Sequence, residues 1–244
     1  MTKYFNKFVI LVVSGVFLLL TGCDTTVDEN VRDNSDSIEH FYSLPDNGPG
    51  YKFKSPMLRG VLGISPIDAD GIRSDRRMLF KKSNSPLELR LHHFRFWTDS
   101  PTKLVQQKIA DYFRRMGLAN KVIRYKPGNK VDYLLHGRLL KFERYVDTKS
   151  NQDKVLVSIE LNISKESTGQ LVVSNTVIHI REKAPRAANA NKTIVNAVKS
   201  FNSALTKALI MFIKKHSPKR YAQRIMVKPE KESPEPKDKN KKSR

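Results

Sequence analysis

Few residues in this chain have the types and spacing that chemistry requires. His92 and His93 are the only adjacent histidines. Neighbours on a strand point to opposite faces, so the pair predicts one buried and one exposed imidazole, not a metal site. Asp68 and Asp70 in "IDADGI" resemble the start of a calcium loop, but Leu79 stands at the twelfth position, where that loop needs glutamate. We therefore expect a polar turn there and no metal.

Catalytic signatures are missing from the sequence as well. It contains no G-x-S-x-G nucleophile elbow and no phosphate-binding glycine loop. Gly60 and Gly63 in "RGVLGIS" lack the rest of a dinucleotide fingerprint, and we expect them to permit close contacts between strands. The sequence predicts no catalytic residues, no cofactor and a role other than catalysis.

The single cysteine, Cys23, stands at the end of an apolar leader. Lys3 and Lys7 give a positive start, and residues 8–20 form an apolar run. That run has the length of a signal-peptide core and is shorter than the roughly 20 residues that span a bilayer. Residues 1–22 therefore predict a signal peptide. A lone cysteine cannot form a disulfide within the chain, so its thiol needs another explanation.

The segment "LTGC" that ends at Cys23 resembles a bacterial lipobox, in which a branched apolar residue and two small residues precede a cysteine that receives lipid. The resemblance implies that Cys23 is the first residue of the mature protein and carries acyl chains such as palmitate. Several acyl chains anchor a protein stably to a membrane. In the enterobacterial sorting scheme, which this segment resembles, Asp24 directly after the cysteine favours retention in the inner membrane.

The chain is strongly basic, with 45 Lys and Arg residues against 24 Asp and Glu residues and a net charge of +21. Such a surplus suits anionic partners such as phospholipid head groups or acidic envelope polymers, and export argues against nucleic acid. Residues 217–244 are rich in charge and proline and poor in apolar residues, which predicts a basic disordered tail. A second interpretation is that this tail holds an anionic membrane surface.

Between leader and tail, the pattern predicts a flexible tether over residues 23–39 and one domain over residues 40–216. Within the domain, alternating or helical spacing of apolar residues predicts strands near 58–64, 76–82, 87–97, 122–125, 131–145, 155–163 and 170–181, and helices between Ser100 and Gly117 and over 189–215. This order indicates an α+β fold, with a mixed or mostly antiparallel sheet and two helices packed on it.

Three aromatic residues stand where the third of these strands leads into the first helix. Trp97 is flanked by Phe94 and Phe96. They are expected either to anchor the core or to line a lipid or peptide groove, and the sequence leaves both interpretations open.

Several segments, in this order along the chain, resemble the ABC-type transport auxiliary lipoprotein family. They are the lipobox, "FYSLP" at 41–45, the stretch 76–105 that contains Trp97, "VDYLLHG" at 131–137 with "FE" at 142–143, and 197–205 with "FNSAL". The basic surplus and the tail depart from the family pattern.

The resemblance implies a non-enzymatic periplasmic lipoprotein with a fold similar to the amino-terminal domain of TolB. Its partners would be the MCE-domain and permease or ATPase subunits of a system that moves lipids or other hydrophobic molecules between membranes. It would tether one end of the conduit, as a single copy or as a homo-oligomer, and many relatives lie in the outer membrane. The alternative is a lipoprotein that activates a peptidoglycan synthase, and a third candidate is a lipid-binding carrier.

Overall fold

The computed structural model describes residues 38–46, 48 and 51–217. Cys23, Asp24, the signal peptide and the basic tail from residue 218 lie outside the described residues, as does the tether up to residue 37. The predictions made for those segments therefore remain predictions.

The described chain contains eight strands, two α-helices and one 3-10 helix. In order they are β1 (His40–Tyr42), β2 (Leu58–Ala69), η2 (Gly71–Ser74), β3 (Arg77–Lys82), β4 (Ser85–Trp97), α2 (Pro101–Met116), β5 (Ala119–Arg124), β6 (Tyr133–Val146), β7 (Gln152–Lys165), β8 (Leu171–Pro185) and α3 (Ala190–His216). Each strand and helix predicted from spacing is present, which confirms the α+β class. None of the helices in this part of the chain is both long and apolar enough to cross a membrane.

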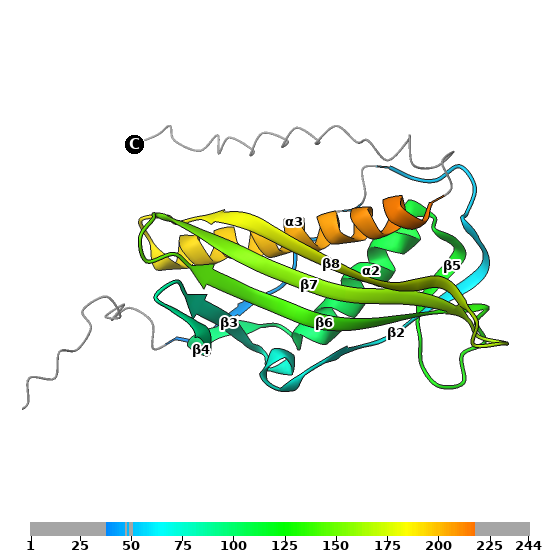
Figure 1. Ribbon diagram of the computed structural model, residues 1–244, viewed down its shortest axis with the longest axis horizontal. Helices are drawn as coiled ribbons and strands as arrows, with labels where there is room; N and C mark the ends of the chain where they lie inside the picture. Colours follow the sequence, from blue (N-terminus) through cyan, green and yellow to red (C-terminus); the bar gives the residue numbers. More distant parts are fainter. Residues whose placement is uncertain (1–37, 47, 49–50, 218–244) are drawn as a thin grey trace, which may run out of the picture. The chain divides into compact units, whose positions relative to one another are not determined.

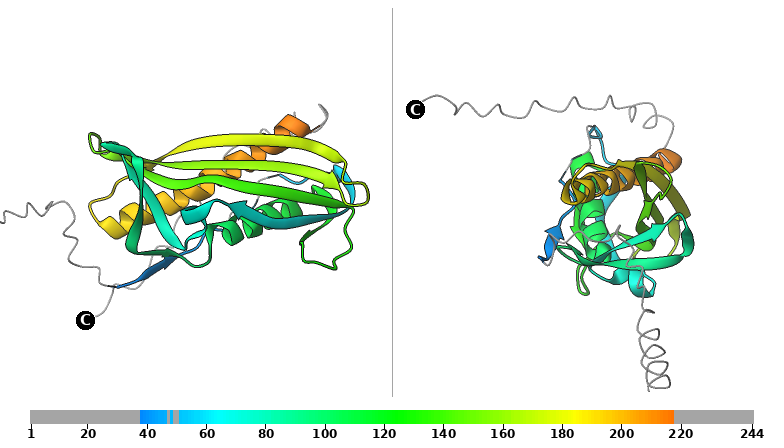
Figure 2. Two further views of the ribbon diagram at one scale, coloured as in Figure 1. Left: turned by 60° about the horizontal axis from the view of Figure 1, so that its bottom comes forward. Right: turned by 90° about the vertical axis from the view of Figure 1, so that its left-hand side faces the viewer.

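The strands form one mixed sheet, and both helices pack on it (Figure 1). The β3–β4, β6–β7 and β7–β8 pairs are antiparallel, whereas β1–β4, β2–β5, β2–β6 and β3–β6 are parallel. Helix α3 lies along β7 and β8, and α2 lies against β2 and β5. Seen end-on, the sheet curves around the helices (Figure 2).

Strand β6 organises the sheet because two strands share one of its edges. Its first half pairs with β2, from Leu62 beside Tyr133 to Ala69 beside Leu139. Its second half pairs with β3, beginning at Leu79 beside Glu143. The other edge of β6 pairs with β7. Two groups of strands, β2–β5 and β1–β4–β3, are therefore joined through β6.

The helices begin and end where their capping residues place them. The Ser100 hydroxyl accepts a hydrogen bond from the Lys103 amide, and Pro101 occupies the first turn, where its missing N–H costs little. Gly117 ends α2 in the left-handed conformation, with a φ of 71°, which glycine adopts without strain. The Asn189 side chain caps α3. The predicted apolar stripe of α3 is buried throughout: Ile194, Val198, Phe201, Leu205, Ala208 and Phe212.

Strand β2 is longer than its apolar pattern predicts. It continues to Ala69, past Pro66, although proline lacks the N–H that a central strand uses. The register of β2 against β6 shifts between Ile64 and Ile67, and this irregularity accommodates the proline. Asp68 therefore lies within the strand, and the expected polar turn begins only at Asp70, which precedes η2.

Candidate interaction site at the edge of the sheet

The three aromatic residues at the end of β4 do not line a common groove. Trp97 is 1% exposed, and its ring centroid lies 5.2 Å from that of Phe142 and 5.4 Å from that of Phe201. Phe96 is half-buried and stacks on Phe41 on the surface, and Phe94 is exposed. Trp97 therefore lies in the core, as the first of the two interpretations expected, and does not line a groove.

The histidine pair divides as its position on a strand predicts. The His92 Nε2 atom is enclosed, without a hydrogen-bond partner, and the ring lies 4.5 Å from the ring of Phe80. His93 is exposed. Burial, followed by the nearby cations of Arg144 and Arg95, lowers the pKa of His92 to about 3. A positive charge on the imidazole would be poorly solvated, and the two arginines would repel it. His92 is therefore neutral at ordinary pH.

The most buried ionic group lies where β6 and β7 are joined. Asp153 is fully buried, and its carboxylate accepts hydrogen bonds from Arg144 and Arg186 at 2.5 to 2.9 Å and from the Asp147 amide at 3.2 Å. Two guanidinium groups thus satisfy one carboxylate. Because these groups come from β6, from the turn before β7 and from the segment after β8, the cluster fastens three parts of the chain together.

One pair of side chains has the types of a nucleophile and its base, and no motif in the sequence marks it. The Ser158 hydroxyl and His179 Nδ1 lie 2.5 Å apart, across β7 and β8. The Ser158 side chain is only 2% exposed, so a substrate does not reach its hydroxyl in this arrangement. Only the register of the two strands brings the pair together, and no local pattern encodes that register. The described residues contain no group of three or more potential metal ligands.

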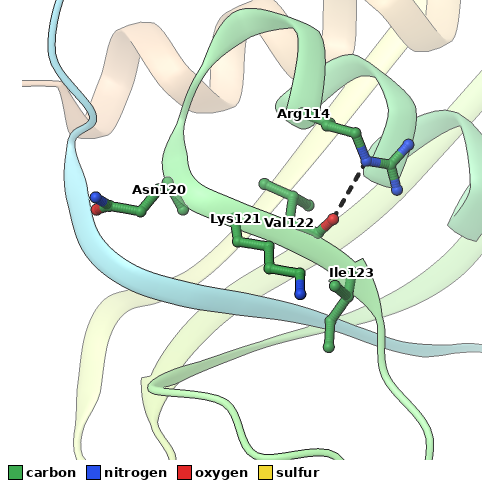
Figure 3. Close-up of a pocket in the computed structure, with 6 residues that line it drawn as sticks. Arg114, Asn120, Lys121, Val122 and Ile123 are labelled. Atoms are coloured by element: carbon green, nitrogen blue, oxygen red, sulfur yellow. Dashed lines mark hydrogen bonds between the residues drawn. The ribbon is translucent and has the colours of Figure 1, made fainter.

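A shallow hollow of about 380 Å³ lies beside β5, in the described part of the chain, and is a candidate binding site (Figure 3). It is lined by Arg114, Ala119, Asn120, Lys121, Val122 and Ile123. From the end of α2, the Arg114 Nε atom donates to the Val122 carbonyl at 3.3 Å, and its Nη1 atom bonds Asp111 at 2.5 Å. The Arg114 guanidinium therefore lies over the strand edge, where Figure 3 shows it.

Local contacts position β5 next to the end of α2. Because Gly117 turns the chain, the Leu118 amide bonds the Phe113 carbonyl, and the Leu118 carbonyl accepts from Met57 and Leu58. The strand begins at the next residue. On its inner side, the Asn120 side chain accepts from the Gly60 amide at 3.0 Å.

Gly60 itself is required where β2 begins. Its φ of 133° strains any residue with a side chain, and an added Cβ would lie 2.4 Å from the Asp132 carboxylate. That carboxylate accepts from the Val61 amide at 2.7 Å. Gly60 therefore permits a close approach, but to the side chain of Asp132, which precedes β6, and not to a neighbouring strand as expected.

Positive charge gathers at this end of the domain. Both helices end here with basic last turns, Arg114 and Arg115 in α2 and Lys214 and Lys215 in α3, which interact favourably with the negative ends of the helix dipoles. Arg115 pairs with Asp46. The exposed side chains of Lys121, Arg124 and Lys126 continue the positive charge along and beyond β5. An anionic ligand or partner fits this surface electrostatically.

The groups behind this surface are neutral or held by the backbone. Lys108 is buried and donates to the Pro45 carbonyl at 3.0 Å, and burial lowers its pKa. Burial also raises the pKa of Tyr112 to about 12. The His216 Nε2 atom lies 2.8 Å from the Thr176 hydroxyl, and burial, with the neighbouring Lys215, lowers its pKa. None of these three side chains lines the hollow.

Solved structures show where this fold occurs elsewhere. Protein XCC0632 from Xanthomonas campestris, described as a member of DUF330, is 16% identical, and the match covers 70% of this chain and 90% of that one with a TM-score of 0.59. The two proteins share a fold. Protein CT253 from Chlamydia trachomatis (6% identity, 70% and 99% covered, TM-score 0.42) and a candidate lipoprotein from Caulobacter crescentus (12%, 52% and 84%, TM-score 0.36) are more distant. No protein-family model and no curated protein matches the sequence.

Proposed function

We propose that this chain is a non-enzymatic lipoprotein of the bacterial envelope that serves as an accessory subunit of an ABC or MCE-type transporter for lipids or other hydrophobic molecules. Its support comes from the lipobox-like segment at Cys23, from the resemblance to the ABC-type transport auxiliary lipoproteins, and from a fold shared with XCC0632. In this role the protein is an adaptor: it is fixed to a membrane and binds the MCE-domain or permease subunits.

The observation that carries the adaptor role is the position of the two ends of the domain. The described chain begins beside β4, where β1 pairs with residues 95–97. It ends after α3, where the Ser217 hydroxyl bonds the Met57 sulfur, close to the start of β5. Figure 1 shows these ends apart. A protein held through its N-terminal segment can therefore present the basic end and the hollow to a partner.

Recovery of bound proteins from membranes tests this function. The full chain, with an affinity tag and chemical crosslinking, is expected to recover an MCE-domain or permease subunit. Recovery of a peptidoglycan synthase without either subunit would show that the activator interpretation is the correct one. A Lys121→Glu variant, which reverses charge on the proposed partner surface, should recover less of the subunit, whereas Lys149→Glu, in the turn between β6 and β7, should recover as much as the native chain.

A further inference from the structure

The outer edge of β5 presents backbone N–H and C=O groups that pair with no described strand. β5 pairs with β2, and no other described strand lies along its second edge. The Tyr125 amide, one residue beyond β5, bonds the Ile64 carbonyl of β2 at 2.8 Å. Because backbone groups alternate sides along a strand, the odd-numbered residues of β5 face β2 and the even-numbered residues face outward. Asn120, Val122 and Arg124 therefore direct their N–H and C=O groups away from the sheet.

The hollow coincides with this edge, and its charge has one sign. Its six lining residues include Arg114 and Lys121 but no carboxylate. The exposed side chains of Arg124 and Lys126 add positive charge at the end of β5 and just beyond it. The Asp111 carboxylate of α2 is bonded to Arg114. The outer edge of β5 thus combines a hollow, backbone donors and acceptors, and positively charged side chains.

We propose that the outer edge of β5 is a docking site for an extended acidic segment of a partner protein, which adds to the sheet as a strand. Strand addition gives affinity through main-chain hydrogen bonds and specificity through alternate side chains. Acidic side chains on one face of the added strand would pair with Arg114 of α2, and those on its other face with Lys121, because successive side chains of β5 point to opposite faces. A lipid head group would use the charge alone, because it cannot match the alternating donors and acceptors of a strand edge. This inference concerns the same surface that the proposed function offers to a transport subunit, but the strand pairing does not depend on which protein supplies the acidic segment.

Arg114 acts as a removable cover for the edge. Short edge strands with lysine resist unwanted pairing, and Arg114 adds to this protection by bonding the Val122 carbonyl. The bond is long at 3.3 Å, and the guanidinium is about half exposed. An incoming strand would donate its own N–H to the Val122 carbonyl, and the released guanidinium would bond an acidic side chain of that strand.

A binding experiment with synthetic peptides tests the proposal. The probe is a fluorescent peptide in which pairs of glutamates alternate with pairs of valines, so that an extended strand carries glutamate on both faces, and it is added to the purified full chain in detergent. Its control is the fully N-methylated analogue, which keeps every charge and loses every backbone donor. We expect the analogue to bind at least tenfold more weakly, and we expect the unmodified peptide to slow amide hydrogen exchange at residues 120, 122 and 124.

Substitutions locate the site. Lys121→Glu combined with Arg114→Gln is expected to weaken peptide binding about tenfold, whereas Lys149→Glu, a charge reversal elsewhere, should leave it unchanged.

Equal binding of the peptide and its N-methylated analogue would overturn the proposal, because charge alone would then explain the interaction. Displacement of the peptide by phosphatidylglycerol vesicles, with unchanged exchange at 120–124, would also overturn it in favour of a membrane surface. The membrane recovery experiment can fail without affecting either result.

Discussion

At the scale of single residues, the fold depends on a few buried polar groups, of which Asp153 is the most demanding. Replacing it with asparagine keeps the shape but leaves Arg144 and Arg186 without their counter-charge. Breaking a buried ion pair from one side costs about 3 to 5 kcal/mol. We expect Asp153→Asn to lower the free energy of unfolding by that amount in urea titrations. Glu88→Gln, which removes an exposed partner of Arg90, should cost less than about 1 kcal/mol.

His92 predicts a pH dependence of stability. Its pKa in the folded chain is about 3, below the ordinary value of 6.5, so the unfolded chain binds the extra proton between these values. Below pH 6.5 the unfolded chain is therefore favoured by the proton that it binds at His92. The free energy of unfolding has its full value above pH 6.5 and decreases as the pH falls toward 3, by at most about 1.4 kcal/mol per pH unit. His92→Gln should therefore lose less stability than the native chain between pH 6 and 4. Parallel pH curves for the two proteins would contradict this assignment.

At the scale of elements, Trp97 joins β4 to the β6 strand and the α3 helix. Removing its ring deletes contacts with Phe142 and Phe201, and large-to-small core changes of this kind cost about 3 to 5 kcal/mol. We expect Trp97→Ala to lower the unfolding free energy accordingly. Phe94→Ala, on the exposed side of the same strand, should cost less than about 1 kcal/mol. Equal effects of the two substitutions would show that Trp97 is not a core anchor.

Local patterns predict the elements better than they predict the sheet. The helix stripe of α3, the capping pair Ser100 and Pro101, and the alternation in β7 depend on neighbours in sequence, and all are present. The parallel pairs of β2 and β3 with β6 join residues 64 to 71 positions apart, and no local pattern reports such contacts. The β5 edge was missed for the same reason: whether a strand is an edge is decided by its partners, not by its own residues.

At the scale of the whole molecule, the prediction concerns Cys23 and Asp24, which precede the described residues. If Cys23 carries lipid, Cys23→Ser should move the protein from the membrane to the soluble fraction, because several acyl chains provide the anchoring. Asp24→Ser should change which membrane holds it, as followed by density-gradient fractionation. An unchanged location would mean that Asp24 is not the sorting signal. A Cys23→Ser protein that stays in the membrane would contradict lipid anchoring.

The shared edge of β6 also has a consequence for the order of folding. Strands β2 and β3 are synthesised well before β6, yet they do not pair with each other and meet only through it. Early in synthesis the chain can form the β3–β4 hairpin, and later the β2–β5 pair, as separate pieces with unpaired edges. Long-range pairing of this kind slows folding and exposes edges to aggregation. Until β6 is in place, the edges of these separate pieces are open to pairing with other chains.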